Sequence, residues 1–188
     1  MKYATQKYAT HVPSDAASIT EVLDASRTQS GRSLGDLCNS GPVLLVFLRH
    51  AGCTFCRETL DDIAQTRSDI EKDGIRIVLV HMGDAEALRN LLHKNGLDSM
   101  DRIHDPSQRL YNAFGLKRGT FLQLFGWNVI ARAIFDGALF RHGVGFVSGD
   151  PTQMPGIFLI RDGEIERRFR HRTAADRADF AKICAPGQ

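Results

Sequence analysis

The chain has 188 residues, of which 43% are apolar and 24% are charged, and its formal net charge is +2. This length fits one domain with a full core, and the ordinary composition excludes wholesale disorder. The small net charge gives no reason to expect a nucleic-acid partner. No stretch of about 18 uncharged apolar residues is present, so we expect no membrane-spanning helix.

Cysteine content and the N-terminus bear on location. Four cysteines are too few for a disulfide scaffold. The N-terminal residues Met1 to Lys7 are polar and lack the apolar segment of a secretory signal. Both observations favour a reducing, cytoplasmic location. There, an exposed pair of cysteines would cycle between dithiol and disulfide rather than stay oxidised.

The first part of the chain predicts short helices before a buried strand. Residues 1 to about 16 are expected to form a polar arm, and a short helix then runs through Leu23. A second short helix or turn is predicted at 33–38, where helical spacing makes Cys38 a core residue rather than a reactive thiol. The apolar run 43–48 predicts a buried strand.

A C-x-x-C sequence, Cys53 and Cys56, lies where this strand turns into a predicted helix. Free backbone N–H groups and the helix dipole stabilise a thiolate at a helix start, which lowers its pKa. Cys56, Leu60 and Ile63 share one helix face, so we expect Cys56 to be the more buried thiol and Cys53 the more exposed one. The pattern predicts a redox-active dithiol.

Two other interpretations of the C-x-x-C stay open. It could be half of a four-ligand zinc site, but Cys38 and Cys184 form no second C-x-x-C, and the seven histidines lack metal-type spacing. The two cysteines could also be ordinary residues of a structural helix. The strand–turn–helix setting favours redox chemistry over both, so we predict no bound metal.

The chain continues with alternating strands and helices. A strand is predicted at 75–80, a helix at 84–95, a short extended segment at 102–106 and a helix at 107–114. Near-continuous apolar strands are typical of parallel strands covered on both faces. The succession predicts an α/β fold.

The segment from about 115 to 150 interrupts this alternation. Its apolar and charged residues predict one or two amphipathic helices, and a helical insertion packed on the domain is the favoured interpretation. A partner or membrane-surface face and a lid near the active site are the alternatives. Exposed apolar residues here could also form the face of a homodimer.

The last part predicts a strand hairpin and a helix. An apolar strand follows Pro155, a turn is expected at 161–164, and a basic return strand runs from 165 to 169. Its arginines are interpreted as a solvated edge that resists pairing, rather than an anion or nucleic-acid site. A final helix is expected from Thr173 through Ile183.

A C-x-x-C after the first core strand, and an X-Pro before a later strand that opens a hairpin, resemble the thioredoxin fold. The resemblance implies a three-layer α/β/α sandwich with a mixed sheet, and the helical insertion then precedes the cis-Pro strand. It also implies a cis Met154–Pro155 peptide bond beside the C-x-x-C. Met154 and Pro155 would then bind an extended partner chain or a substrate thiol.

Four segments together are similar to the peroxiredoxin-like branch of the AhpC/TSA superfamily, whose best known relatives are the selenoprotein-L-related redox proteins. These segments are 47–56, 115–119, 149–156 and 170–176. The resemblance covers about residue 30 to the end and accommodates the long gap from Cys56 to Pro155. We therefore expect an arm and short helix over 1–30, and a thioredoxin-like domain over 31–188 with the helical insertion at about 115–150.

The two related families suggest different roles for the same residues. Thioredoxins place a buried Asp shortly before the first cysteine, and this Asp helps to move the proton of the buried thiol. This chain has Phe47 at that position and therefore lacks this proton acceptor. Arg49 or His50 is then the candidate that favours a thiolate. Peroxiredoxins use an Arg from later in the chain, for which Arg118 and Arg132 are candidates.

The identity of the attacking thiol stays open. By the thioredoxin alignment Cys53 attacks and Cys56 resolves, whereas by the peroxiredoxin alignment Cys56 attacks peroxide and Cys53 resolves. Either way, the resemblance implies a thiol-dependent oxidoreductase with a Cys53/Cys56 dithiol-disulfide couple. It would reduce peroxides or disulfides with an external thiol donor and without a metal or organic cofactor. The alternative is a partner-binding thioredoxin-fold module without significant turnover, whose disulfide switches a surface at 119–142.

Overall fold

The structure is a computed structural model that describes residues 16–120, 123–124, 126–127, 129 and 149–185. In this part of the chain a five-stranded sheet has the order β3-β2-β1-β4-β5. The strands are β1 Val43–Phe47, β2 Arg76–His81, β3 Asp101–His104, β4 Gly156–Arg161 and β5 Glu164–Arg170. The helices are α1 Ala16–Ala25, α2 Leu34–Ser40, α3 Thr54–Lys72, α4 Ala85–Lys94, α5 Arg109–Ala113 and α9 Phe180–Cys184.

The sheet is mixed, as expected. Strand β1 pairs in parallel with β2, and β2 pairs in parallel with β3. On its other side β1 pairs antiparallel with β4, which forms an antiparallel hairpin with β5. Asp162 and Gly163 both have positive φ in the hairpin turn, which suits the right-handed twist of the two strands.

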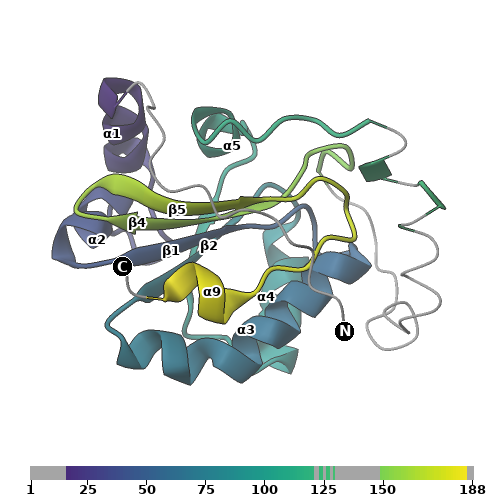
Figure 1. Cartoon of the computed structure of the whole chain (residues 1–188), viewed down its shortest axis with the longest axis horizontal. Coiled ribbons are helices and arrows are strands. Elements are labelled where there is room, and N and C mark those ends of the chain that lie inside the picture. The colour runs from purple at the N-terminus through teal and green to yellow at the C-terminus, as the bar shows by residue number, and fades with distance from the viewer. Residues whose placement is uncertain (1–15, 121–122, 125, 128, 130–148, 186–188) are drawn as a thin grey trace.

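Helices cover both faces of the sheet, with α3, α4 and α9 on one side and α1 and α5 on the other (Figure 1). Alternate residues of β1 enter two cores. Leu44 and Val46 pack with α3, α4 and α9, whereas Leu45 and Phe47 pack with α1, α2 and α5. The three-layer thioredoxin-like sandwich predicted from the sequence is confirmed.

Two details of the C-terminal part differ from expectation. The last helix begins at Phe180, because Asp179 caps it by accepting from Lys182 N–H. Residues 173–176 instead form a turn, closed by Asp176, whose carboxylate accepts from Arg172 N–H at 2.6 Å. The basic strand β5 is largely half-buried rather than solvated. For example, Arg170 donates to Phe114 O at 2.6 Å, which ties β5 to the end of α5.

The expected cis Met154–Pro155 bond is wrong, because none of the peptide bonds in the described residues is cis. Trans is the lower-energy form of an X-Pro bond unless its surroundings enforce cis. Here the trans chain is held on both sides of the bond. Met154 N–H donates to Lys117 O at 3.2 Å, and Pro155 O accepts from His171 Nδ1 at 3.2 Å.

Several expectations fall partly or wholly outside the described residues. These include the arm before Ala16 and most of the insertion expected at about 115–150. Arg118, near the start of that segment, forms an antiparallel bridge with Gln153, which follows its end. The expected boundary between 1–30 and 31–188 stays a prediction. Within the described ranges, no helix is both long and apolar enough to cross a membrane.

Candidate active site

The two cysteines lie at the carboxyl end of β1, where the sheet meets the first turn of α3. Two hydrogen bonds fix Leu48 just before them. Its N–H donates to Val80 O at 2.9 Å, and its carbonyl accepts from the Tyr111 hydroxyl at 2.5 Å. Cys53 is the N-cap residue of α3, and its own N–H donates to His50 O at 3.0 Å. The chain thus turns from strand to helix within a short, well-bonded loop.

Both thiols are buried. Cys56 is 4% exposed and Cys53 is 7% exposed, so Cys56 is the more buried of the two, as expected. Cys53 was expected to be exposed because it lies at the helix cap, and in the structure it is buried as well. Neither forms a disulfide in this structure. The sulfur of Cys56 accepts from Arg49 N–H at 3.3 Å, and Arg49 Nη1 lies 3.7 Å from the sulfur of Cys53.

The surroundings move the pKa values of the two thiols in opposite directions. A hydrogen bond from the Cys56 thiol, helped by the Arg49 guanidinium, lowers the pKa of Cys53 to about 6 against the opposing effect of burial. The pKa of Cys56 is raised well above its usual value, because it holds the shared proton and is buried. The surroundings therefore favour the negative charge on Cys53 and the proton on Cys56.

Arg49 is held in place by a second loop. The residue is 5% exposed, and its Nη2 donates to Pro151 O. A turn at Asp150 supports this loop, with Thr152 N–H donating to Asp150 Oδ1 at 2.8 Å. Arg118, one of the expected late arginines, pairs with Asp150 Oδ2 at 2.7 Å and has a largely exposed side chain. Arg132, the other candidate, lies outside the described residues.

Of the two candidates beside the C-x-x-C, only Arg49 carries a positive charge at neutral pH. His50 is buried. Burial and the adjacent Arg49 lower the pKa of His50 to about 4, so its ring is neutral. A neutral imidazole gives no coulombic support to a thiolate, and this role belongs to Arg49.

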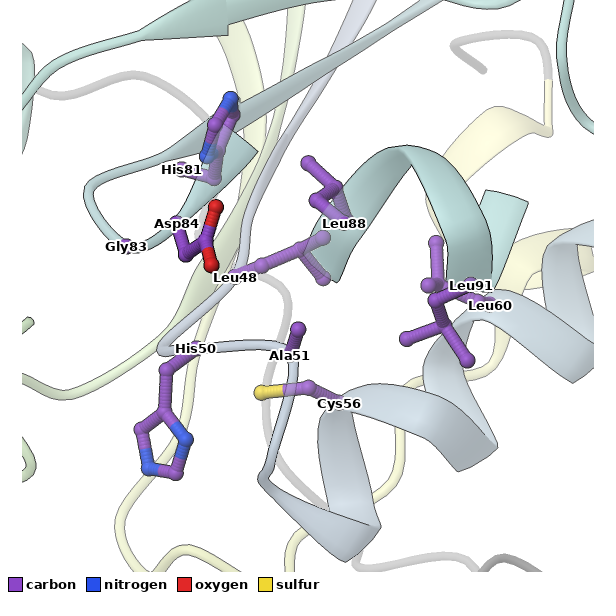
Figure 2. A pocket seen from close by; sticks show the side chains of 10 residues that line it. All are labelled: Leu48, His50, Ala51, Cys56, Leu60, His81, Gly83, Asp84, Leu88 and Leu91. Atoms are coloured by element: carbon purple, nitrogen blue, oxygen red, sulfur yellow. The ribbon is translucent and has the colours of Figure 1, made fainter. Parts of the chain in front are cut away.

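Two small cavities flank Cys56. The first lies between α3, α4 and the ends of β1 and β2, and its side chains include Leu48, Leu60, Leu88 and Leu91 (Figure 2). His50 and His81 lie at opposite ends of this cavity, with their rings directed away from each other (Figure 2). Burial and the nearby His104 lower the pKa of His81 to about 4, so this ring is also neutral at pH 7.

The second cavity adjoins both thiols. It has a volume of about 10 Å³. Besides Cys53, Cys56 and Arg49, its lining includes Phe55, Thr59, Pro155, Ile157, His171 and Ala174. The walls come from the end of β1, the first turns of α3, the start of β4 and the segment after β5. Residues that are far apart in the sequence therefore lie beside the two cysteines in this cavity.

The structure brings Pro155 to the dithiol and sets Met154 beside it. Pro155 lines the second cavity, and Met154 packs with Leu124 and Val129 in a small apolar cluster against Phe55. Within the described residues, no group of three or more His, Cys, Asp and Glu side chains is placed to hold a metal ion.

Three residues of the site were not predicted from the sequence. Tyr111 lies in the helix predicted at 107–114, and nothing in the sequence indicates that its hydroxyl donates to Leu48 O. Pro151 holds Arg49 through a backbone carbonyl, which a sequence does not reveal. His171 follows the return strand expected at 165–169 and lies in the segment 170–176 that resembles the peroxiredoxin-like family, and neither pattern places it beside the dithiol.

The mixed sheet with a dithiol at the first strand–helix junction defines a thioredoxin-fold thiol redox protein. The AhpC/TSA antioxidant enzyme family model matches residues 62–175, and the chain belongs to this family. The matched region begins after Cys56, so the assignment of the cysteines rests on the geometry of the site.

Curated relatives agree with this family. Peroxiredoxin-like 2C of Mus musculus is 24% identical over 87% of this chain and 80% of its own length. Prostamide/prostaglandin F synthase of Salmo salar is 29% identical over 73% of this chain and 70% of its own length. The family places the chain among thiol-dependent redox proteins.

Solved structures show the same fold. A structure of the Xanthomonas campestris bacterioferritin comigratory protein, described for alkyl peroxide reduction, has a TM-score of 0.58 at 14% identity and covers 88% of both chains. A cysteine mutant of the peroxiredoxin 6 of Arenicola marina has a TM-score of 0.59 at 13% identity, over 85% of this chain and 66% of its own. At these identities the likeness concerns the fold alone.

Proposed function

We propose that this protein reduces peroxides or disulfides through a Cys53/Cys56 dithiol-disulfide couple, with Cys53 as the attacking thiol. The observation that carries the proposal is the position of Arg49, whose guanidinium Nη1 lies 3.7 Å from the sulfur of Cys53, whereas the sulfur of Cys56 accepts from its backbone N–H. The Arg49 guanidinium and the Cys56 thiol both stabilise a negative charge on Cys53. A thiolate is the reactive form, so the thioredoxin-like assignment of roles is favoured over the peroxiredoxin-like one.

The reaction has two steps on the protein. With a peroxide, the Cys53 thiolate attacks one oxygen, an S–O bond forms, the O–O bond breaks, and the leaving oxygen takes up a proton. Cys53 is then a sulfenic acid, and the Cys56 sulfur displaces its oxygen to form the Cys53–Cys56 disulfide and water. With a disulfide substrate, a mixed disulfide takes the place of the sulfenic acid.

The remaining parts of the proposal concern binding and turnover. Pro155 and Met154 form the wall that an oxidised substrate contacts as it reaches Cys53. An external thiol donor reduces the Cys53–Cys56 disulfide and restores the dithiol, and the cycle uses no metal or organic cofactor. The Arg49 guanidinium stays in contact with Cys53 through the first step.

Rapid mixing tests the proposal. The reduced protein is mixed with hydrogen peroxide, and separately with a small disulfide, and products are trapped and assigned by peptide mass spectrometry. We expect the first step to survive in Cys56→Ser and to disappear in Cys53→Ser. The reverse pattern would assign the attack to Cys56, and absence of a Cys53–Cys56 disulfide under either oxidant would contradict the redox couple.

A second candidate is a redox-switched binding module. One observation favours it, because Trp127 is 80% exposed close to Val129, which packs with Met154 near the dithiol. The same mixing experiment separates the two functions. Slow reaction with both oxidants, combined with a partner that binds only one redox state, would select the binding module.

A further inference from the structure

The Arg49 guanidinium is buried beside Cys53 and is held by few atoms. The residue is 5% exposed, its Nη1 lies 3.7 Å from the sulfur of Cys53, and its Nη2 donates to Pro151 O. Its Nε is buried and has no hydrogen-bond partner among the described residues. In this part of the chain, Pro151 O is also the only oxygen that accepts from the guanidinium. The place of this cation therefore depends on where Pro151 O lies.

The group that holds Arg49 is a carbonyl rather than a carboxylate. Among the described residues, no Asp or Glu forms an ion pair with Arg49. A paired carboxylate would offset the positive charge that acts on Cys53, whereas a carbonyl orients the guanidinium and leaves its net charge in place. Because the coulombic attraction falls with distance, any shift of the guanidinium away from Cys53 should raise the pKa of this thiol.

A turn over residues 150–153 presents the Pro151 carbonyl. Gln153 N–H donates to Asp150 O at 3.3 Å, which closes the turn. Proline is favoured at the second position of such a turn because its ring fixes φ, and Asp is favoured at the first because its side chain bonds to the backbone two residues on. Here Asp150 Oδ1 accepts from Thr152 N–H at 2.8 Å and from the Thr152 hydroxyl at 2.6 Å. The Asp150 side chain thus shapes the turn around Pro151.

The turn is also packed closely against two neighbouring segments. Thr152 O accepts from Gly119 N–H at 2.7 Å. Gly149 has a φ of 93° and lies so close to the loop after β2 that a Cβ at this position would be 2.9 Å from Met82 Cγ. These contacts fix the two ends of the turn, and the bonds to Asp150 Oδ1 fix its interior.

The second oxygen of Asp150 contributes less to this arrangement. Its Oδ2 accepts from Arg118 Nε at 2.7 Å, but the Arg118 side chain is 71% exposed. An ion pair with one solvated partner contributes little to the free energy of folding. The contacts of Oδ1 with Thr152 are therefore the ones that we expect to determine where Pro151 O lies.

We propose that Asp150 is a positioning residue that acts on Cys53 through two other residues. Its Oδ1 shapes the turn, the turn places Pro151 O, and Pro151 O keeps the Arg49 guanidinium beside Cys53. This inference rests on the proposed function, because it concerns the cation that stabilises the attacking thiolate. Asp150 takes no part in the chemical steps.

The sign of the effect separates this role from direct electrostatics. Against the opposing effect of burial, the hydrogen bonds from Thr152 and the ion pair with Arg118 lower the pKa of Asp150, so its carboxylate is ionised at neutral pH. Removal of a negative charge would by itself stabilise an anion on Cys53 and lower the pKa of this thiol. Loss of the turn would instead release the Arg49 guanidinium and raise it.

The test measures the pKa of Cys53 in matched variants. Reduced protein is treated with iodoacetamide over a range of pH, and the label on Cys53 is quantified by peptide mass spectrometry. Asp150→Ala removes the oxygen that accepts from Thr152, whereas Asp150→Asn keeps this oxygen and removes the charge. Arg118→Gln removes the ion pair alone. The Arg49→Gln background contains no cation for the turn to position.

We expect Asp150→Ala to raise the pKa of Cys53 by about half a unit or more. Asp150→Asn and Arg118→Gln should leave this pKa close to that of the wild type, because both keep the Oδ1 contacts of the turn. In the Arg49→Gln background, Asp150→Ala should cause no further rise, because two changes that act through one residue are not additive.

Three results would overturn the inference. The first is an unchanged or lowered pKa of Cys53 in Asp150→Ala. The second is an equal rise in Asp150→Asn or Arg118→Gln, and the third is a rise that persists in the Arg49→Gln background. A wild-type protein in which Cys56 is alkylated more readily than Cys53 would instead overturn the proposed function.

Thr152→Val covers the case in which Asp150→Ala does not fold. Val is close to Thr in shape and keeps the backbone N–H, so the change removes only the hydroxyl that contacts Asp150 Oδ1 at 2.6 Å. We expect the pKa of Cys53 to rise in this variant, by less than in Arg49→Gln. An unchanged pKa in Thr152→Val would contradict the role of the turn.

Discussion

The Arg49 guanidinium lies 3.7 Å from the sulfur of Cys53 and is held by the Pro151 carbonyl. The same residue uses its backbone N–H to contact the sulfur of Cys56 at 3.3 Å. One residue of the strand–helix loop thus contacts both thiols. This arrangement combines with the helix start to place a thiolate inside a largely apolar site.

Replacing Arg49 should weaken this thiolate. In Arg49→Gln the pKa of Cys53 should rise from about 6 toward its ordinary value of 9.0, by about one unit or more. The hydrogen bond from Cys56 remains and keeps the pKa below 9.0. The measurement is the rate of iodoacetamide alkylation of Cys53 against pH. Arg67→Gln, on α3 and paired with Glu71, is the control and should leave the profile unchanged.

The ionised Cys53 should also make stability depend on pH. Its pKa is about 6 in the folded protein and near 9.0 when unfolded, so the unfolded state binds more protons in this interval. The contribution of Cys53 should therefore grow from pH 6 to pH 9 and vanish as the pH falls through about 6. Urea unfolding of the reduced wild type and of Cys53→Ser gives the difference. If the free energy of unfolding of the two proteins depended on pH in the same way, the result would contradict an ionised Cys53 in the folded protein.

Tyr111→Phe should destabilise the loop between β1 and α3 without directly changing the reactivity of the two cysteines. The change removes the hydroxyl that bonds to Leu48 O at 2.5 Å and lies 3.2 Å from Val80 O. Leu48 O would then be left in an apolar site, at a cost of about 1–2 kcal/mol. Denaturant unfolding should show a lower midpoint with an unchanged slope. No loss of stability would mean that the carbonyl finds another partner.

The segment after β5 is tied to α3 by a half-buried charge cluster. Arg177 Nε donates to Asp62 Oδ2 at 2.9 Å, and Arg177 Nη1 lies 3.9 Å from Glu58 Oε1. Arg177→Met leaves two carboxylates close together and should cost roughly 2 kcal/mol, since Arg177 is partly exposed. Arg67→Met removes a pair on α3 whose carboxylate, on Glu71, is 44% exposed, and it should cost well under half as much. Equal losses in urea unfolding would refute this reading of the cluster.

Much of the fold follows from local patterns in the sequence. The apolar runs that become β1 and β2 are buried on both faces and surrounded by turn signals, so their type and position were predictable. The C-x-x-C at a helix start was predictable because the strand, the turn and the helical spacing after Cys56 agree. The start of the last helix was misplaced, because both Asp176 and Asp179 suit a helix start and only one of them caps it.

The chemistry of the site was less predictable, because it depends on which way side chains face in three dimensions. Arg49 and His50 are adjacent and both looked able to support a thiolate, yet burial leaves His50 neutral. The cis bond expected at Pro155 came from resemblance alone, and the local hydrogen bonds hold the trans form. His171 is distant in sequence from Cys56, and only the packing of β4 and β5 against β1 brings it to the same cavity.

The measurement that tests the central claim most directly is competitive alkylation of the reduced, unaltered chain. A substoichiometric amount of iodoacetamide is added at neutral pH, and the label is assigned to Cys53 or Cys56 by peptide mass spectrometry. The account predicts label on Cys53 almost alone, because Cys53 is the thiolate and Cys56 holds the shared proton. Label that appears first on Cys56, or equally on both, would contradict it.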